Sequence, residues 1–140
     1  LTLRGIPTLH NRIKEIEKNA INMAKFLHGH SLIHDVYHPA LSHTVNHNIW
    51  KRDFKGSTGL FAFSLKKKYS LKSIKKFYNK LKIFKLGYSW GGFDSLITFP
   101  PLSKRSFKSE VKGNIIRVYC GLEDSQDQIS DILNALKVFK

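Results

Sequence analysis

Apolar residues recur every three or four positions between Thr8 and His28, which is the period of one face of an α-helix. These positions are Leu9, Ile13, Ile16, Ala20, Met23, Ala24 and Leu27. Pro7 near the start of the pattern and Gly29 just after its end are typical of helix termini. The pattern therefore predicts a long helix, about 20 residues and roughly 30 Å in length.

Short apolar stretches bounded by turn residues predict strands in the rest of the chain. They lie near residues 33–37, 59–65, 83–87, 95–99 and 115–120. A second helical pattern follows Ser70, which can cap its N-terminus, and a third follows Asp124 or Ser125. The polar stretch between the prolines at 100 and 101 and Gly113 indicates a loop. Together these elements predict an α+β fold, in which helices cover one face of a mostly antiparallel sheet of about four strands.

Basic residues dominate the charge, and the formal net charge of the 140 residues is +14. Lysines at 72, 75, 76 and 80 fall on one face of the second predicted helix. We interpret them as a solvated helix face. A basic nucleic-acid-binding module is the less favoured alternative, because the sequence has no RNP, zinc-finger or KH motif.

The apolar runs are shorter than the ~18 residues that a membrane span needs, so we expect no membrane partner. The N-terminal stretch shows no targeting signal. A single cysteine, Cys120, cannot form an internal disulfide, which suits a reducing compartment, and we expect a cytoplasmic protein. Cys120 ends a predicted strand, and we expect it to be buried and unreactive.

The segment LGYSWGGFDSLI, residues 86–97, is the most informative motif in the chain. Gly87, Ser89 and Gly91 match the G-x-S-x-G pattern of a hydrolase nucleophile elbow. Such hydrolases place the catalytic histidine after the serine, whereas all seven histidines of this chain precede Ser89. The hydrolase interpretation is therefore rejected.

Three segments instead resemble one enzyme family, in the same order and spacing. They are YSWGGFDSLI, the earlier WKRDFKGSTGLF, and the later IIRVYCGLEDSQDQISDI. The chain resembles the C-terminal domain of cystathionine β-lyase, in the pyridoxal-phosphate (PLP)-dependent transsulfuration family. Relatives that act at the γ carbon usually carry S-L-G-G where this chain has Ser89-Trp90-Gly91-Gly92, so Trp90 and Tyr88 favour the β-lyase branch.

The resemblance implies the small C-terminal domain of a fold-type I PLP-dependent transferase, with residues 1–30 as a long linking helix and 31–140 as the α+β core. It implies an enzyme of methionine biosynthesis that converts cystathionine to homocysteine, pyruvate and ammonia, and that forms a homo-oligomer, as a tetramer. The family's Schiff-base lysine and PLP-binding large domain match no segment of this chain. We therefore expect a fragment that is inactive on its own; a non-catalytic remnant of such a lyase is the other alternative.

The resemblance also assigns the candidate site residues. Arg117 matches the arginine that binds the substrate α-carboxylate, Ser89 helps to hold the same group, and Tyr88 and Trp90 shape the pocket wall. An arginine suits this role because its guanidinium binds a carboxylate through two parallel hydrogen bonds. Without the resemblance, the leading interpretation of Arg117 is a structural ion pair with an acid such as Glu123 or Asp124, and the one for Tyr88 and Trp90 is ordinary packing.

Three histidines are candidate metal ligands. His43 and His47 are four residues apart and would share a helix face, and His38 would have to supply a third ligand. No cysteine or acidic residue sits at matching spacing, and the resembled family does not depend on a metal. We therefore expect no metal site at these three residues and assign them local hydrogen bonds or caps.

Overall fold

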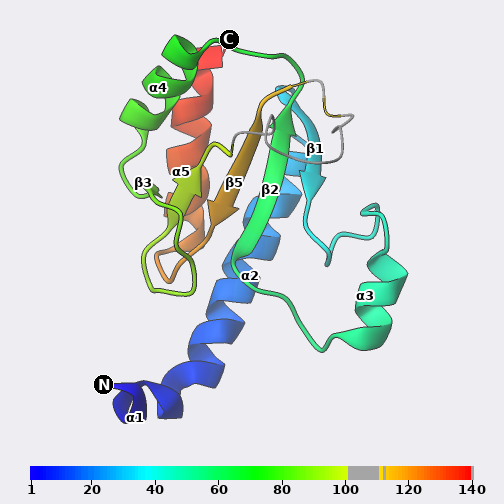
Figure 1. Ribbon diagram of the computed structural model, residues 1–140, viewed down its shortest axis with the longest axis vertical. Coiled ribbons are helices and arrows are strands. Elements are labelled where there is room, and N and C mark those ends of the chain that lie inside the picture. Colours follow the sequence, from blue (N-terminus) through cyan, green and yellow to red (C-terminus); the bar gives the residue numbers. More distant parts are fainter. Residues whose placement is uncertain (101–110, 112, 140) are drawn as a thin grey trace.

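The computed structural model describes residues 1–100, 111 and 113–139. Its centre is a five-stranded sheet with the strand order β1-β2-β5-β4-β3 (Figure 1). The strands are β1 (Ile33–Tyr37), β2 (Leu60–Leu65), β3 (Lys85–Leu86), β4 (Leu96–Thr98) and β5 (Ile115–Tyr119). All neighbours pair antiparallel except β3 and β4, which are parallel. The predicted α+β class is confirmed, with five strands in place of about four.

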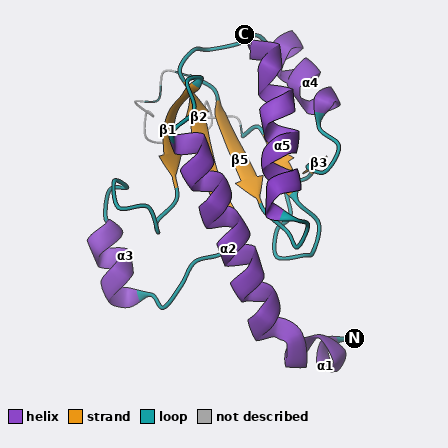
Figure 2. Cartoon of the chain, turned by 180° about the vertical axis from the view of Figure 1, so that it is seen from behind, coloured by secondary structure: helices purple, strands orange, loops and turns teal. Residues whose placement is uncertain are grey.

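Helices cover one face of this sheet, and none of the described residues forms a helical layer on the other (Figures 1 and 2). The covering helices are α2 (Leu9–His28), α4 (Leu71–Lys80) and α5 (Ser125–Leu136). The short elements are α1 (Thr2–Gly5), η1 (Ile6–Thr8), α3 (His47–Asp53) and η3 (Lys137–Phe139). Of these, α3 lies away from the sheet, beyond the β1 edge (Figure 1).

Helix α2 begins one residue after Thr8 and ends before Gly29, as its apolar period predicts. Its C-terminal half is buried against the sheet, where Ala20, Met23 and Leu27 lose all exposure to solvent. Its N-terminal part is different, because Leu9 and Ile13 each remain 43% exposed. The apolar face therefore belongs to the core of the described residues only from Ile16 onward.

The predicted helix caps are present. The Ser70 hydroxyl accepts a hydrogen bond from the Ser73 backbone N–H at the start of α4. Asp124, not Ser125, caps α5 and accepts from the backbone N–H groups of Gln126 and Asp127. The predicted loop that follows Pro101 falls almost entirely outside the described residues.

The predicted strand over 83–87 shrinks to the two residues of β3, and Asp131 explains why. The Asp131 carboxylate on α5 accepts hydrogen bonds from the backbone N–H groups of residues 82, 83 and 84, at 2.8, 2.9 and 3.1 Å. These donors are no longer available to a neighbouring strand. A buried side chain therefore binds the backbone N–H groups of a segment that the apolar pattern assigns to the sheet.

Side chains of β5 alternate between the helix-covered face and the open face of the sheet. Ile116 and Val118 are fully buried against the helices, whereas Arg117 between them is half-buried and points to the open face. In the ladder Arg117 is opposite Ala62 on β2 and Thr98 on β4. Both neighbours are small, which leaves space around the guanidinium.

Candidate functional site

Arg117 and the loop after β3 form the candidate site at the open face of the sheet. The Arg117 Nη2 donates a hydrogen bond to the backbone carbonyl of Tyr88 at 2.5 Å. This contact joins the strand that carries the guanidinium to the loop that carries Ser89 and Trp90. The structure thus brings two of the predicted site residues, Arg117 and Tyr88, into direct contact.

The acids that could have paired with Arg117 have other partners. Glu123 accepts hydrogen bonds from the Ser95 backbone N–H at 2.8 Å and from the Ser95 hydroxyl at 2.7 Å, and Asp124 caps α5. Among the described residues, no carboxylate lies within 4.0 Å of the Arg117 guanidinium. The guanidinium therefore keeps donors that can bind the carboxylate of a ligand.

Large aromatic side chains of this loop face solvent. Tyr88, Trp90 and Phe93 are 71%, 60% and 70% exposed, far above what ordinary core packing leaves. The loop backbone is nevertheless held in place: the Tyr119 hydroxyl donates to the Gly92 carbonyl at 2.8 Å. Gly91 adopts a φ of +92°, which only glycine reaches without strain. Internal contacts thus hold the loop backbone while its aromatic side chains remain exposed to solvent.

Ser89 is exposed in the same loop, between Tyr88 and Trp90. No helix begins after it, because residues 89–95 form no regular element before β4. A nucleophile elbow needs a strand-to-helix turn at this point, so the geometry agrees with rejecting the hydrolase interpretation. Ser89 has the position of a polar neighbour of the Arg117 site, although no hydrogen bond joins the two side chains.

Lys85 is the lysine beside this loop, and its setting bears on whether it could form a Schiff base with PLP. A lysine that forms a Schiff base must lose its proton, which a lowered pKa favours. The lysine beside this loop, Lys85, has the opposite setting: its hydrogen bond with Asp94, at 2.7 Å, raises its pKa. Both side chains are exposed to solvent. The setting of Lys85 therefore does not favour the neutral amine that Schiff-base formation requires.

His43 and His47 do not share a helix face, so that part of the prediction is wrong. His43 lies in a turn before α3, because Asn46 adopts a left-handed conformation (φ 69°) and the helix starts only at His47. His38 is fully buried, and its Nδ1 accepts from the Ala40 backbone N–H at 3.2 Å. His47 Nδ1 instead contacts the Pro39 carbonyl at 2.8 Å.

Two further expectations concern burial. Cys120 is buried, as predicted, and burial raises the pKa of its thiol well above the usual range. The lysines at 72, 75, 76 and 80 of α4 are all exposed, as a solvated helix face requires. Lys76 and Lys80 also line a hollow of about 610 Å³ together with Lys82, Lys137 and Asn134.

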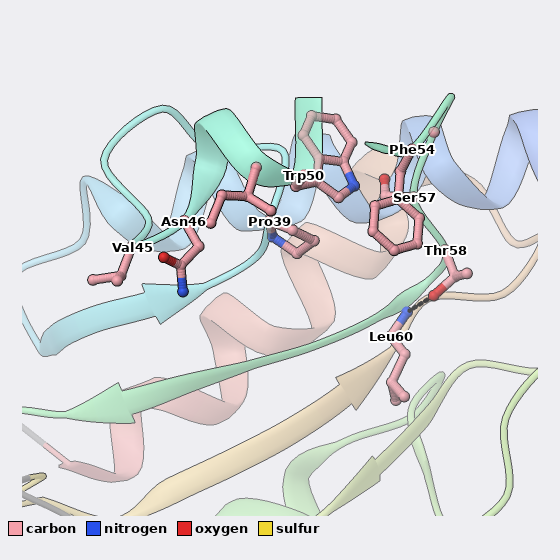
Figure 3. Close-up of a pocket in the computed structure, with 10 residues that line it drawn as sticks. Pro39, Val45, Asn46, Trp50, Phe54, Ser57, Thr58 and Leu60 are labelled. Atoms are coloured by element: carbon pink, nitrogen blue, oxygen red, sulfur yellow. Dashed lines mark hydrogen bonds between the residues drawn. The ribbon is translucent and has the colours of Figure 1, made fainter. Parts of the chain in front are cut away.

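A second, apolar groove of about 450 Å³ lies beside α3 and was not predicted from the sequence (Figure 3). Trp50 of α3 and Phe54, which directly follows α3, face the segment that leads into β2. In that segment the Leu60 N–H donates to the Thr58 hydroxyl at 3.2 Å. Phe54 is 62% exposed. The signal was present in the segment WKRDFKGSTGLF, which carries both aromatic residues but has too few turns to give a clear helical period.

Comparison with known proteins places the chain in a family. The model of the family described as Cys/Met metabolism PLP-dependent enzyme matches residues 1–137. The chain belongs to this family of PLP-dependent enzymes. The predicted membership and the PLP cofactor of the family are thereby confirmed.

Individual relatives differ in the activity that their names state. An L-alanine/L-glutamate racemase of Wolbachia pipientis wMel is 42% identical over 97% of this chain and 34% of its own length. A putative cystathionine beta-lyase of Rhizobium johnstonii is also 42% identical, over 93% of this chain and 34% of its own length. A solved cystathionine gamma synthase from Xanthomonas oryzae pv. oryzae, in complex with aminoacrylate and cysteine, superposes with a TM-score of 0.84 at 28% identity, over 98% of this chain and 37% of that one.

The family members are therefore PLP-dependent enzymes of the lyase and synthase type, with a racemase among them. This chain spans about a third of the length of these relatives. Within residues 1–100, 111 and 113–139, we find no helix with the length and apolar character of a membrane span.

Proposed function

We propose that this chain is the substrate-carboxylate part of a PLP-dependent carbon–sulfur β-lyase that converts cystathionine to homocysteine, pyruvate and ammonia. The observation that carries the proposal is the Arg117 guanidinium beside the Tyr88 carbonyl, with no acidic partner among the described residues. Tyr88 and Trp90 in the adjoining loop add the feature that favours the β-lyase branch. The membership of the family supplies the reaction type.

Each residue has a role in holding the substrate. The Arg117 guanidinium binds the α-carboxylate through two parallel hydrogen bonds and fixes its orientation. The Ser89 hydroxyl donates to the same carboxylate, and Tyr88 and Trp90 form an apolar wall that excludes water from one side. Holding the carboxylate in this way directs the Cα–H of the amino acid toward the base that removes its proton.

The remaining groups lie in the part of the protein that this chain does not contain. PLP bound there would supply an electron sink. A lysine of that part would hold the cofactor and act as the base. The complete enzyme acts in methionine biosynthesis in the cytoplasm. It forms a homo-oligomer, which we propose is a tetramer. Exposed apolar residues at the N-terminal end, including Leu3, Ile6 and Leu9, support contact with such further protein surface.

A racemase is the second candidate function, because the Wolbachia relative with 42% identity is an L-alanine/L-glutamate racemase. Racemisation also begins with removal of the Cα proton from an amino acid whose carboxylate is held in place. The Arg117 site would serve both reactions equally. The two candidates differ in what leaves the Cβ atom, which a β-lyase must expel and a racemase must retain.

Product analysis of the complete enzyme tests the proposal. We expect cystathionine to give pyruvate, ammonia and homocysteine in equal amounts. Cystine and cysteine would be tested as alternative substrates. L-Alanine and L-glutamate would be followed in parallel for formation of the D-enantiomers by chiral chromatography. Racemisation without pyruvate formation would support the second candidate and contradict the first.

The chain alone should show no lyase activity, since no lysine of the candidate site has the required setting. We expect PLP added to the purified chain to give no visible absorbance band that borohydride reduction fixes to a lysine. Labelling of one lysine in this experiment would contradict the proposed division of roles. Binding to DNA that weakens steeply with salt would instead favour the nucleic-acid-binding alternative.

A further inference from the structure

A cluster of two histidines and one aspartate lies at the sheet edge formed by β1, away from the Arg117 site. His28 is the last residue of α2, Asp35 lies in β1, and His43 lies in the turn before α3. Because β1 and β3 are the two opposite edges of the sheet, this cluster is separate from the loop that follows β3. Three segments of the chain thus converge on one point.

The three side chains are close enough to bind one ion. Their ligand atoms, one from each side chain, all lie within 4.8 Å of one another. His43 Nε2 is 3.3 Å from Asp35 Oδ1, and the rings of His28 and His43 stack with their centroids 3.9 Å apart. Ligands of one tetrahedral zinc are about 3.4 Å apart, given bonds of roughly 2.0 to 2.1 Å. Small rotations of exposed side chains suffice to reach that spacing.

The aspartate is oriented toward this point by the backbone. Its Oδ1 accepts a hydrogen bond from the Val36 N–H at 2.7 Å, which restricts rotation of the carboxylate. The pairing register of β1 with β2 also shifts between Ile33 and Asp35. Such a bulge redirects the side chains next to it. Asp35 is therefore positioned by the strand and not by its histidine neighbour alone.

We propose that His28, Asp35 and His43 form a binding site for a borderline divalent cation of the Zn²⁺ class. Two imidazoles and one carboxylate are a donor set that zinc accepts and that Mg²⁺, which requires oxygen ligands, does not. The side chains of His43 and Asp35 are 32% and 41% exposed, so water can complete the coordination. This site is independent of the proposed function.

Bound cation would link the end of α2 and the strand β1 to the turn that leads into α3. The same turn carries Val45 and Asn46, which line the apolar groove. Coordination would therefore hold the groove-forming segment against the core. The alternative is an ion pair between His43 and Asp35 beside a stacked His28, which needs no metal.

Zinc titration of the metal-free chain distinguishes the two. We expect calorimetry with ZnCl₂ to show one site per chain and no heat with MgCl₂. His28→Ala, His43→Ala and Asp35→Asn should each weaken Zn²⁺ binding by at least about tenfold, as the loss of groups around a metal site does. Saturating Zn²⁺ should also raise the Tm of the wild type, and this rise should be lost in the three variants.

His10→Ala is the matched control, because His10 is an exposed histidine at the other end of α2. It should bind Zn²⁺ as the wild type does. The proposal is wrong if wild type shows no saturable binding, if His28→Ala and His43→Ala bind like wild type, or if His10→Ala loses as much affinity as they do. Metal-free Tm values of all variants within about 2 °C of wild type would show that folding is unchanged.

Discussion

Glu123 and Arg117 carry opposite charges and are six positions apart in the sequence, yet they differ in how the protein satisfies their hydrogen-bonding groups. The Glu123 carboxylate accepts from Ser95 and from the Gln128 side chain, whose amide lies at 3.2 Å and is fully buried. The Arg117 guanidinium has one backbone carbonyl as its partner among the described residues. Buried charged groups that stabilise a fold are normally satisfied by hydrogen bonds within the protein, as Glu123 is. The remaining donors of Arg117 are available to the substrate carboxylate that we propose as its ligand.

Asp131 resembles Glu123 in this comparison, because hydrogen-bond donors within the protein also satisfy its carboxylate. Three backbone N–H groups bind its carboxylate, and it is 7% exposed. The difference between the two kinds of charged residue makes the function of each testable. Substitution of a residue whose charge is satisfied by internal hydrogen bonds should lower stability. Substitution of Arg117, or of Trp90 in the loop after β3, should leave stability unchanged and alter substrate binding.

Asp131→Ala should have the largest effect on stability. Three backbone donors would lose their acceptor in a nearly buried position, and we expect the free energy of unfolding to fall by about 3 kcal/mol. Denaturant unfolding followed by circular dichroism measures this. Asp94→Ala is the control, since its exposed ion pair with Lys85 should contribute under about 1 kcal/mol. Equal losses in the two variants would contradict the comparison.

His38 should make the fold sensitive to acid. Burial lowers the pKa of His38 from 6.5 to about 4, so the unfolded chain binds a proton at a pH where the folded chain does not. The neutral histidine therefore stabilises the fold fully above pH 6.5, and this stability is lost as pH falls from 6.5 to about 4. We expect a loss on the order of 2–3 kcal/mol across that window.

His38→Gln isolates this contribution, because glutamine does not titrate. The difference in unfolding free energy between wild type and variant should change with pH between 6.5 and 4 and be constant above 7. A pH-independent difference would show that His38 does not remain neutral in the fold. The buried Nε2, which has no hydrogen-bond partner among the described residues, is consistent with a ring that stays neutral.

Trp90→Ala should have a smaller effect, on binding and not on folding. Its indole is 60% exposed, so we expect the free energy of unfolding to change by less than about 0.5 kcal/mol. In the complete enzyme KM for cystathionine should rise roughly three- to tenfold, as expected for loss of one apolar wall. Phe93→Ala is the matched control, because Phe93 is exposed in the same loop and has no assigned role. A rise in KM of equal size in both variants would remove Trp90 from the site.

The regular part of the fold could be predicted because its signals are local. The apolar period of α2 and the capping residues Ser70 and Asp124 give the helices almost to the residue. The shortened β3 could not be predicted, because its backbone donors go to Asp131, which lies 47 or more positions away in sequence. Likewise, nothing local in the sequence brings His28 next to Asp35 and His43.

The candidate site was accessible from the sequence through its resemblance to a family and not through its pattern. In a strand such as IIRVY, periodicity alone places Arg117 on one face without indicating whether an acid lies beside it. The structure adds that the acids named as possible partners, Glu123 and Asp124, are engaged elsewhere. The left-handed Asn46, which delays the start of α3, is the kind of backbone detail that the residue pattern does not contain.

Steady-state kinetics of Arg117→Ala in the complete enzyme test the central claim most directly. Loss of a bidentate charged contact should lower kcat/KM for cystathionine, mainly by raising KM. The corresponding loss of transition-state stabilisation is roughly 2 to 5 kcal/mol, and Arg117→Lys should restore little of it. The PLP absorbance spectrum and the unfolding free energy should stay as in wild type. If kcat/KM of Arg117→Ala remained within about twofold of wild type, a loss under ~0.5 kcal/mol, Arg117 would not bind the substrate carboxylate.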